Sequence, residues 1–260
     1  MRPNTTKQTL KAGGTSIGTQ IQQMTTVEAA RILGVAGAEF VWIDAEHGPY
    51  HQESVHALIH ALADAGATPI VRVGEYAYSL VSRALDSGAQ GIILPRARDL
   101  AELREALSWT RFPPEGARGY GLGGPHVGYA KAGFPEIIAH ANAHTMVIVQ
   151  IENEWAVEHC DDLLELPFID VALVGPADLS ISMGIPGEVT HPRFVAAVER
   201  VIAACERRGV APGIHLRSPA AAPDWMARGM RFVSAGAEHV FMLERATEAM
   251  TGLKQLAAKR

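Results

Sequence analysis

The segment Glu39–Gly48 reads EFVWIDAEHG, and it brings three titratable side chains to the point where an apolar run ends. The run Phe40–Ile43 predicts a strand buried on both faces, because it is apolar without alternation. Asp44, Glu46 and His47 follow it directly. The carboxyl ends of the strands carry the active site in an α/β barrel, so this segment indicates both a fold and the place of its chemistry.

Apolar runs of strand length recur along the chain, with amphipathic segments after them. Eight runs are expected to form strands: Ser16–Gln22, Phe40–Ala45, Thr68–Val73, Gly91–Arg96, Met146–Glu152, Val171–Pro176, Ala211–Leu216 and Arg231–Ala235. Eight stretches are expected to form helices: Thr26–Leu33, Glu53–Ala65, Tyr78–Ser87, Asp99–Thr110, Trp155–Leu166, Pro192–Arg208, Pro219–Arg228 and Glu244–Ala258. A strand followed by a helix, eight times over, predicts a (β/α)₈ TIM barrel.

Composition and charge narrow the class of protein. The 260 residues contain no linker or break in composition, so we expect a single barrel domain over residues 1–260. The net charge of −5 predicts no general attraction to nucleic acid or membrane lipid. The polar N-terminus lacks the apolar core of a signal peptide, and Cys160 and Cys205 are too few for a disulfide framework. We expect a cytoplasmic protein with reduced thiols.

The stretch Arg111–Thr145 is irregular and rich in Pro and Gly. Long loops in a barrel are usually functional and lie at the carboxyl ends of the strands. We therefore expect this stretch to cover the mouth of the active site.

Two later strands also end on a carboxylate. Glu152 ends the fifth expected strand and Asp178 follows the sixth, and neighbouring strands of a barrel bring their ends together. Two unpaired carboxylates would repel each other, and a divalent cation such as Mg²⁺ or Mn²⁺ would remove the conflict. The alternative is that Glu152 pairs with an arginine and Asp178 caps the helix after it.

Two basic side chains also stand at strand ends. Arg72 ends an otherwise apolar strand, so its guanidinium either forms a structural ion pair or points into the mouth, where its fork suits a carboxylate or an enolate oxygen. His47 follows Asp44 by three positions, and a carboxylate beside an imidazole fixes its tautomer and prepares it as a base. The alternative is a histidine of the core or surface.

Five segments in order resemble the HpcH/HpaI aldolase family, the metal-dependent class II pyruvate aldolases. They are DAEHG at 44–48, Arg72, FPPEGARGYG at 112–121, QIE at 150–152 and GPADLS at 175–180. The resemblance implies a barrel of the phosphoenolpyruvate/pyruvate type. It also implies an enzyme that makes or cleaves a carbon–carbon bond between a 2-oxo acid enolate, from pyruvate or hydroxypyruvate, and an aldehyde.

The resemblance also implies a cofactor and an assembly. The cofactor would be a divalent metal ion, Mg²⁺, Mn²⁺ or Co²⁺. The chain would form a homo-oligomer, a hexamer built as a trimer of dimers, in which the C-terminal helix is exchanged with a neighbouring subunit.

Matching motifs imply the roles of the central residues. Glu152 and Asp178 would be the metal ligands, and Arg72 would stabilise the enolate oxygen. His47, oriented by Asp44, would be the base that removes a proton from C3 of the 2-oxo acid.

Further residues are implied for the substrates. Gln150 would lie beside the metal, and the backbone N–H groups of Ala177 and Asp178 would receive the substrate carboxylate at a helix N-terminus. Asp86 matches an aspartate that reaches toward a neighbouring subunit's site. His215 stands where relatives carry an aliphatic residue facing the aldehyde, so it is either a polar residue of the acceptor pocket or a core histidine.

Three alternatives remain for the chemistry. A Schiff-base aldolase is disfavoured, because the lysines at positions 7, 11, 131, 254 and 259 do not end a predicted strand. A lyase of CoA thioesters, of the citrate lyase β-subunit type, would use the same kind of barrel. A catalytically silent barrel that binds a sugar acid would bind ligand without exchanging the C3 protons of pyruvate.

Overall fold

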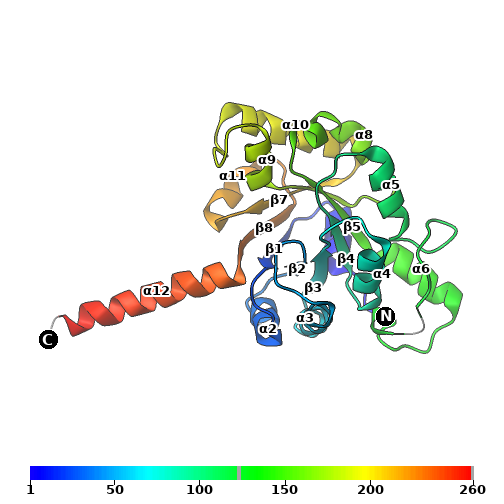
Figure 1. Ribbon diagram of the computed structural model, residues 1–260, viewed down its shortest axis with the longest axis horizontal. Coiled ribbons are helices and arrows are strands. Elements are labelled where there is room, and N and C mark those ends of the chain that lie inside the picture. The colour runs from blue at the N-terminus through cyan, green and yellow to red at the C-terminus, as the bar shows by residue number, and fades with distance from the viewer. Residues whose placement is uncertain (122–123, 259–260) are drawn as a thin grey trace.

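Eight parallel strands close into a barrel in sequence order, as predicted, in the computed structural model, which describes residues 1–121 and 124–258 (Figure 1). The strands are β1 (Ser16–Ile21), β2 (Phe40–Asp44), β3 (Thr68–Arg72), β4 (Gly91–Leu94), β5 (Met146–Ile151), β6 (Val171–Val174), β7 (Ala211–Leu216) and β8 (Phe232–Ala237). Each strand pairs with the next, and β8 pairs with β1. The predicted TIM barrel is therefore confirmed.

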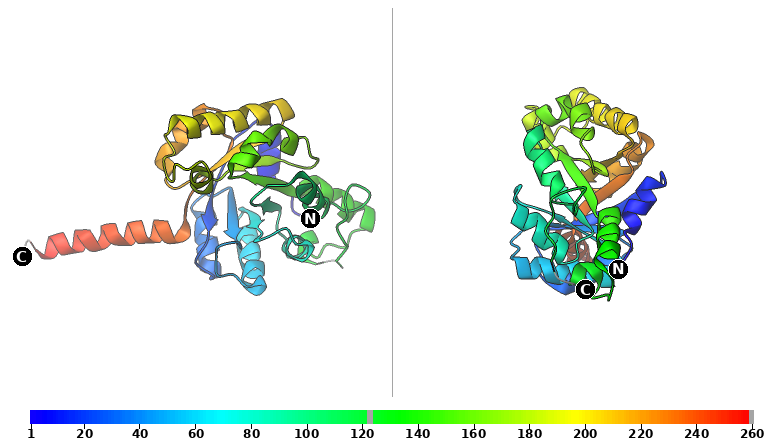
Figure 2. Two further views of the ribbon diagram at one scale, coloured as in Figure 1. Left: turned by 45° about the horizontal axis from the view of Figure 1, so that its top comes forward. Right: turned by 90° about the vertical axis from the view of Figure 1, so that its right-hand side faces the viewer.

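Helices surround the strands, except that the C-terminal helix projects away from the barrel (Figure 2). They are α1 (Thr5–Lys11), α2 (Val27–Val35), α3 (Gln52–Asp64), α4 (Tyr78–Asp86), α5 (Leu100–Ser108), α6 (Phe134–His144), α7 (Glu154–Glu158), α8 (Cys160–Leu164), α9 (Pro176–Ser182), α10 (Pro192–Arg208), α11 (Ala222–Ala227) and α12 (Glu238–Ala257), with 3₁₀ turns at Pro125–Val127 and Pro219–Ala221. None of those in the described ranges has the length and hydropathy needed to cross a membrane.

Several boundaries differ from the predicted ones. Helix α1 was not expected, and α6 lies within the stretch expected to be irregular. The segment Trp155–Leu166 divides at His159, where φ is −102° and ψ is 16°, into α7 and α8. Helix α12 begins at Glu238, directly after β8, and not at Glu244.

The expectation that Arg111–Thr145 covers the mouth is wrong. The stretch joins the end of α5 to the start of β5, and the helices of a barrel run back toward the amino ends of the strands. Its first residue, Arg111, stacks over Phe168, just before β6, with 5.0 Å between guanidinium carbon and ring centroid. Helix-to-strand connections lie at the amino end of a barrel, so this segment cannot reach the mouth from its own subunit.

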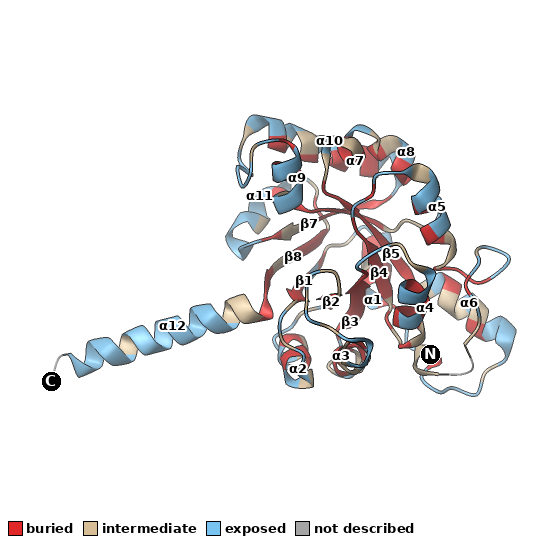
Figure 3. Ribbon diagram, viewed as in Figure 1, coloured by how far each residue is buried: buried red, intermediate tan, exposed pale blue. Residues whose placement is uncertain are grey.

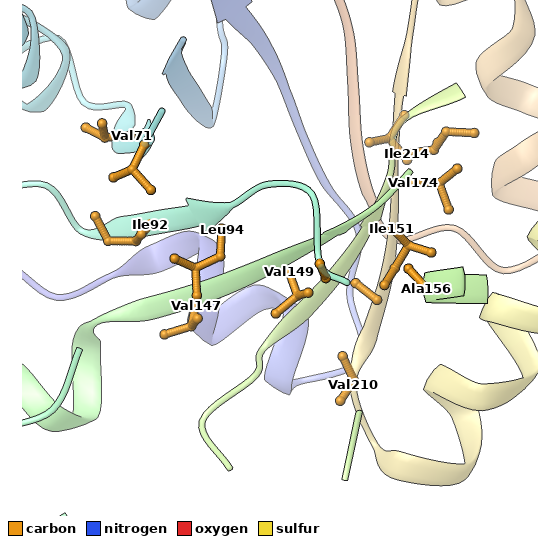
Figure 4. Packing of buried hydrophobic residues seen from close by; sticks show 14 of the residues in the cluster. Val71, Ile92, Leu94, Val147, Val149, Ile151, Ala156, Val174, Val210 and Ile214 are labelled. Atoms are coloured by element: carbon orange, nitrogen blue, oxygen red, sulfur yellow. The ribbon is translucent and has the colours of Figure 1, made fainter. Parts of the chain in front are cut away.

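Alternating strand side chains divide the core into two layers. Inside the barrel, Phe40 and Phe232 stack with ring centroids 3.9 Å apart, and Leu10 of α1 joins the same cluster. Outside the barrel, Val147, Val149 and other strand residues pack beneath the helices (Figure 4). The strands are buried on both faces (Figure 3), which explains why their sequences are apolar without alternation.

Candidate active site

Asp44 and Arg72 form a buried ion pair at the carboxyl ends of β2 and β3. The two residues are register partners, and the side chain of Arg72 is only 6% exposed. Its Nε and Nη2 atoms donate to the two carboxylate oxygens of Asp44 at 2.9 and 2.7 Å. Nε2 of Gln20 also donates to Asp44, at 2.8 Å. Removing one partner from such a pair typically costs about 3–5 kcal/mol, so the pair fixes this part of the mouth.

The prediction that Asp44 orients the His47 imidazole is wrong. Asp44 meets His47 only through the backbone, accepting the N–H groups of Glu46 and His47 at 3.2 Å each. Both oxygens of the Asp44 carboxylate already accept hydrogen bonds from Arg72 or Gln20. Asp44 therefore shapes the turn that follows β2, as aspartates commonly do, and leaves the imidazole half exposed.

The structural ion pair, one of the two possibilities for Arg72, is observed, and its role toward a substrate stays a prediction. Arg72 is paired with Asp44 and lies 5.0 Å over the ring of Trp42, and it also extends toward the centre of the barrel. Its Nη1 atom donates to Oε1 of Gln150 at 3.4 Å and lies 3.3 Å from Oε2 of Glu46. A planar guanidinium with five donors can hold its partners on one side and keep an N–H group for a ligand.

Glu46 and Arg96 belong to this cluster; the sequence pattern placed Glu46 at the strand end without assigning it a role, and Arg96 was not selected. The Glu46 side chain is 5% exposed, and its Oε1 atom lies 2.7 Å from Nε of Arg96 and 3.8 Å from Nε2 of His47. Neither of its oxygens has a hydrogen bond of good geometry among the described residues, so these contacts are electrostatic. The sequence contains a pattern that could have indicated each residue. Glu46 stands in the motif DAEHG, and Arg96 follows the fourth strand much as Arg72 ends the third.

Arg96 also holds Glu152 through its backbone. Its N–H group donates to Oε1 of Glu152 at 2.6 Å, and its φ of 53° is left-handed, which is uncommon for a residue other than Gly. Residues in such conformations gather at functional sites. Burial, with the nearby charges of Asp178 and Glu46, raises the pKa of Glu152 to about 7, against the lowering effects of the Arg96 N–H and the Arg72 charge.

The alternative roles proposed for Glu152 and Asp178 are not observed. No arginine or lysine side chain of the described residues lies within 4.0 Å of Glu152. Asp178 lies in the first turn of α9, is exposed, and makes no side-chain hydrogen bond or ion pair in the described part of the chain. Gly175 lets β6 approach Glu152 closely, since a Cβ there would lie 3.0 Å from Oε2 of Glu152 and 2.9 Å from Nε2 of Gln150.

These side chains line one cavity of about 320 Å³ at the mouth. Its lining consists of Glu46, His47, Arg96, Arg98, Glu152, Asn153 and Asp178. No group of three or more His, Cys, Asp or Glu side chains suited to a metal ion occurs among residues 1–121 and 124–258. The groups available to bind a metal are therefore two carboxylates, the buried Glu152 with its raised pKa and the exposed Asp178. Two carboxylates suit a hard cation that keeps its other coordination positions for water or substrate oxygens.

Ala177 and His215 differ in their access to this cavity. Ala177 is exposed in the first turn of α9, where backbone N–H groups have no acceptor within the helix. His215 points into the barrel from β7, where its Nδ1 atom lies 2.8 Å from Oγ of Ser234 and its ring meets Trp42 edge-on at 5.0 Å. Burial, and secondarily the charge of Arg72, lowers the pKa of His215 to about 4. His215 is thus a neutral group inside the barrel.

Asp86 does not join the cluster in this chain. It ends α4, at the amino end of the barrel, and its Oδ1 atom accepts a hydrogen bond from Nη2 of Arg118 at 2.8 Å. A role at a neighbouring subunit's site stays a prediction.

Lys7 is also remote from the mouth, because its α1 helix closes the amino end and its Nζ atom donates to the Thr145 carbonyl at 2.7 Å. Lys259 lies outside the described residues.

Comparisons with known proteins agree on one family. Residues 23–244 match the HpcH/HpaI aldolase/citrate lyase family. The chain is 33% identical over 251 residues to a 4-hydroxy-2-oxo-heptane-1,7-dioate aldolase of Escherichia coli, covering 95% of this chain and 93% of that one. It is 33% identical to a 2-keto-3-deoxy-L-rhamnonate aldolase of Salmonella gallinarum, covering 93% and 90%. The crystal structure of an HpcH/HpaI aldolase from Desulfitobacterium hafniense superimposes with a TM-score of 0.90 at 28% identity, covering 95% and 96%.

The partly buried His215 predicts a specific dependence of stability on pH. Its pKa is about 4 in the folded chain and near 6.5 in the unfolded chain, so the unfolded chain binds more protons between these values. The contribution of His215 to stability should therefore fall as the pH falls from 6.5 to 4, whereas that of Glu152, whose pKa is about 7 in the folded chain, rises over most of this interval. His215→Leu should remove up to about 3 kcal/mol of that loss, from 1.36 kcal/mol per pKa unit.

Urea unfolding at several pH values between 4 and 7 measures this slope. Replacement of the exposed His51 by Leu is the matched control and should keep the wild-type slope. An equal slope in His215→Leu and wild type would place the titrating group elsewhere.

Proposed function

The chain belongs to the HpcH/HpaI aldolase/citrate lyase family, and we propose that it is a divalent-metal-dependent class II aldolase. Its substrates would be a 2-oxo acid such as pyruvate or hydroxypyruvate and an aldehyde, joined or separated at a carbon–carbon bond. The observation that carries this proposal is the meeting of Glu152 and Asp178 in one cavity with His47 and Arg96, while neither carboxylate has a cationic side-chain partner among residues 1–121 and 124–258.

Glu152 and Asp178 would hold the cation. A divalent cation bound there supplies the positive charge that polarises the keto group of a 2-oxo acid. Arg72 presents a fixed guanidinium beside the cavity, held from behind by Asp44, and would stabilise the negative charge on the keto oxygen. Gln150 bonds Arg72 and borders Glu152 across Gly175, so it would keep these two groups in register.

His47 would remove the C3 proton of the donor. Its ring is half exposed at the cavity, and its Nε2 atom faces Glu46 Oε1 at 3.8 Å, so Glu46 and not Asp44 is the carboxylate beside it. The proton moves to the imidazole as the C3–H electron pair becomes the enolate double bond. In the cleavage direction the same base would take the hydroxyl proton of the aldol product.

The remaining predicted residues have supporting positions. The free N–H groups of Ala177 and Asp178 would receive the donor carboxylate at the start of α9. His215 lies inside the barrel with Trp42 and Ser234, close enough for the Arg72 charge to act on it, and would form a polar floor beneath the acceptor. We also propose a cytoplasmic location, which the two free cysteines support.

Helix α12 supports an oligomer. It leaves the barrel after β8 and projects away from it (Figures 1 and 2), with Met242, Leu243, Met250, Leu253 and Leu256 more than half exposed. Ile17 of β1 is 52% exposed, because α12 does not pack back over the barrel wall. A helix with exposed apolar side chains and an uncovered strand in one chain suit exchange between subunits, and we propose a hexamer built as a trimer of dimers.

The test of the proposed function is exchange of the C3 protons of pyruvate with deuterium oxide, followed by NMR. Exchange should require Mg²⁺, Mn²⁺ or Co²⁺ and cease after chelation.

Glu152→Gln and Asp178→Asn should each weaken Mn²⁺ binding at least 10-fold, and the exposed Asp162→Asn should not. Wild-type exchange in exhaustively chelated protein would refute the metal-dependent mechanism, and binding of pyruvate without any exchange would indicate a silent barrel. Turnover of a CoA thioester but no aldol product would favour the lyase alternative.

Arg72→Lys should lower kcat strongly, because an ammonium group cannot hold both oxygens of Asp44 and also serve the keto oxygen. Loss of one preorganised donor costs about 3–4 kcal/mol in comparable sites, which is roughly a 100- to 1000-fold loss of kcat. Steady-state aldol kinetics measure it. Arg83→Lys, which alters an exposed guanidinium bonded to Gln52, is the control. A loss of less than about threefold would mean that Arg72 is only structural.

His47→Ala should keep Mn²⁺ and pyruvate binding and lose C3 exchange, because the chelating groups remain and the base does not. Calorimetry measures the binding and NMR the exchange. His51→Ala, four residues along the chain and exposed, should exchange normally. Normal exchange in His47→Ala would assign the base to another group.

Light scattering should give a mass near six times 27.8 kDa. Leu253→Asp should lower that mass by placing a charge in the contact that covers α12, while Lys254→Asp, on the neighbouring position, should leave it unchanged. A monomeric wild-type protein at micromolar concentration would contradict the proposed assembly.

A further inference from the structure

A second polar cavity lies at the amino end of the barrel, opposite the mouth. It holds about 360 Å³ and is bordered by α1, the start of β7 and the segment before β6. This volume is within the range of small-ligand sites. We call it the amino-end cavity. None of the residues proposed for aldol chemistry lines it.

The charges around the amino-end cavity are unbalanced. Its titratable lining comprises the cations Lys7, Lys11, Arg111 and Arg231 and the anions Glu115 and Asp170, a formal net charge of +2. Asp170 is engaged by Lys7, with Oδ2 and Nζ 3.0 Å apart, and by the Val147 N–H group at 2.9 Å. Glu115 accepts a hydrogen bond from Asn142 at 3.0 Å. Both carboxylates that line the amino-end cavity are thus already engaged by neighbouring groups of the protein.

Arg111 is a buried cation that forms no close ion pair in the described part of the chain. The residue is 3% exposed, and none of the carboxylates in the described part of the chain lies within 4.0 Å of it. Its Nη1 atom donates to the carbonyl and hydroxyl oxygens of Thr110 at 3.2 Å each. Nε and Nη2 donate no hydrogen bond within residues 1–121 and 124–258. A buried charge is costly unless it is closely paired, and burial lowers the pKa of this guanidinium against the more distant attraction of Asp170 and Glu115.

Phe168 holds the Arg111 guanidinium in place. Its ring lies 5.0 Å from the guanidinium carbon, and its backbone has a φ of 74°, a conformation that is strained for a bulky side chain. The surrounding structure must impose such a conformation, and here it places the ring against the planar face of Arg111. The edge of the guanidinium that carries Nε and Nη2 is the one suited to a forked contact with an oxyanion.

We propose that the amino-end cavity is a binding site for a small phosphate-bearing anion. A phosphate group carries about −1.5 to −2 charges at neutral pH, which matches the excess of +2. Arg111 would contact it through Nε and Nη2, and the exposed Lys11 at the end of α1 would provide a second, mobile cation. Inorganic phosphate and a phosphate monoester share this chemistry. The site is independent of the aldolase chemistry proposed for the mouth.

Calorimetric titration of metal-free protein tests the proposal, with chloride keeping the ionic strength constant. Inorganic phosphate should bind saturably with a stoichiometry of one per chain, and a comparison with glycerol phosphate and with acetate distinguishes the free ion, a monoester and a simple carboxylate. Arg111→Gln should weaken phosphate binding at least 10-fold and Lys11→Gln at least threefold. Arg83→Gln and Lys131→Gln, which remove the same charges from exposed positions elsewhere, should bind as wild type does.

Lys11→Gln keeps the test decisive if Arg111→Gln fails to fold, because Lys11 is exposed. Phosphate binding that does not saturate, that is unchanged in Lys11→Gln, or that is displaced by pyruvate would overturn the proposal. Preferential binding of acetate over phosphate would also overturn it. Since no turnover is measured, failure of the aldolase assay would leave this result unaffected.

Discussion

The buried ion pair between Asp44 and Arg72 is the constraint on which the mouth of the barrel depends. It joins the ends of two neighbouring strands at partner positions, so the parallel register of β2 and β3 sets its geometry. A shift of either strand by one residue would turn its side chain to the outer face and separate the pair. Because Asp44 accepts two hydrogen bonds from Arg72 and also the N–H groups of Glu46 and His47, one carboxylate fixes both the guanidinium and the turn that carries the imidazole.

The two ends of the barrel differ in the charges they leave unmatched. At the mouth, Glu152 and Asp178 lack a cationic side-chain partner in the described part of the chain, while Glu46 is held between Arg72 and Arg96. At the amino end, Arg111 has no carboxylate within 4.0 Å among the described residues. An unmatched charge near the barrel interior is unfavourable in the isolated chain, so each end is complementary to a ligand of the opposite sign. The cation proposed for the mouth and the anion proposed for the amino end follow from the same principle.

The carboxylates of the mouth differ in their surroundings, and the number of hydrogen-bond donors around each one distinguishes their roles. Asp44 is fully enclosed and satisfied by hydrogen bonds, so it is a structural anchor. Glu152 is nearly as enclosed but receives a single backbone N–H group, and its pKa rises to about 7. Asp178 is exposed at the start of a helix. Residue type alone does not distinguish an anchor from a ligand; the number of donors around each carboxylate does.

The sequence by itself determined the barrel and the chemical groups at its strand ends. Apolar runs of strand length and the position of the charge that ends each run are local properties, so Arg72, Glu152 and Asp178 could be placed at the mouth in advance. Only the tertiary structure decided which groups meet. It paired Asp44 with Arg72 and placed Glu46 beside His47, because the register between strands sets those contacts. In the folded chain Arg111–Thr145 lies at the amino end, Asp86 is bonded to Arg118, and His215 points into the barrel and contacts Ser234. Each of these outcomes depends on segments far apart in sequence, about which local pattern carries no information.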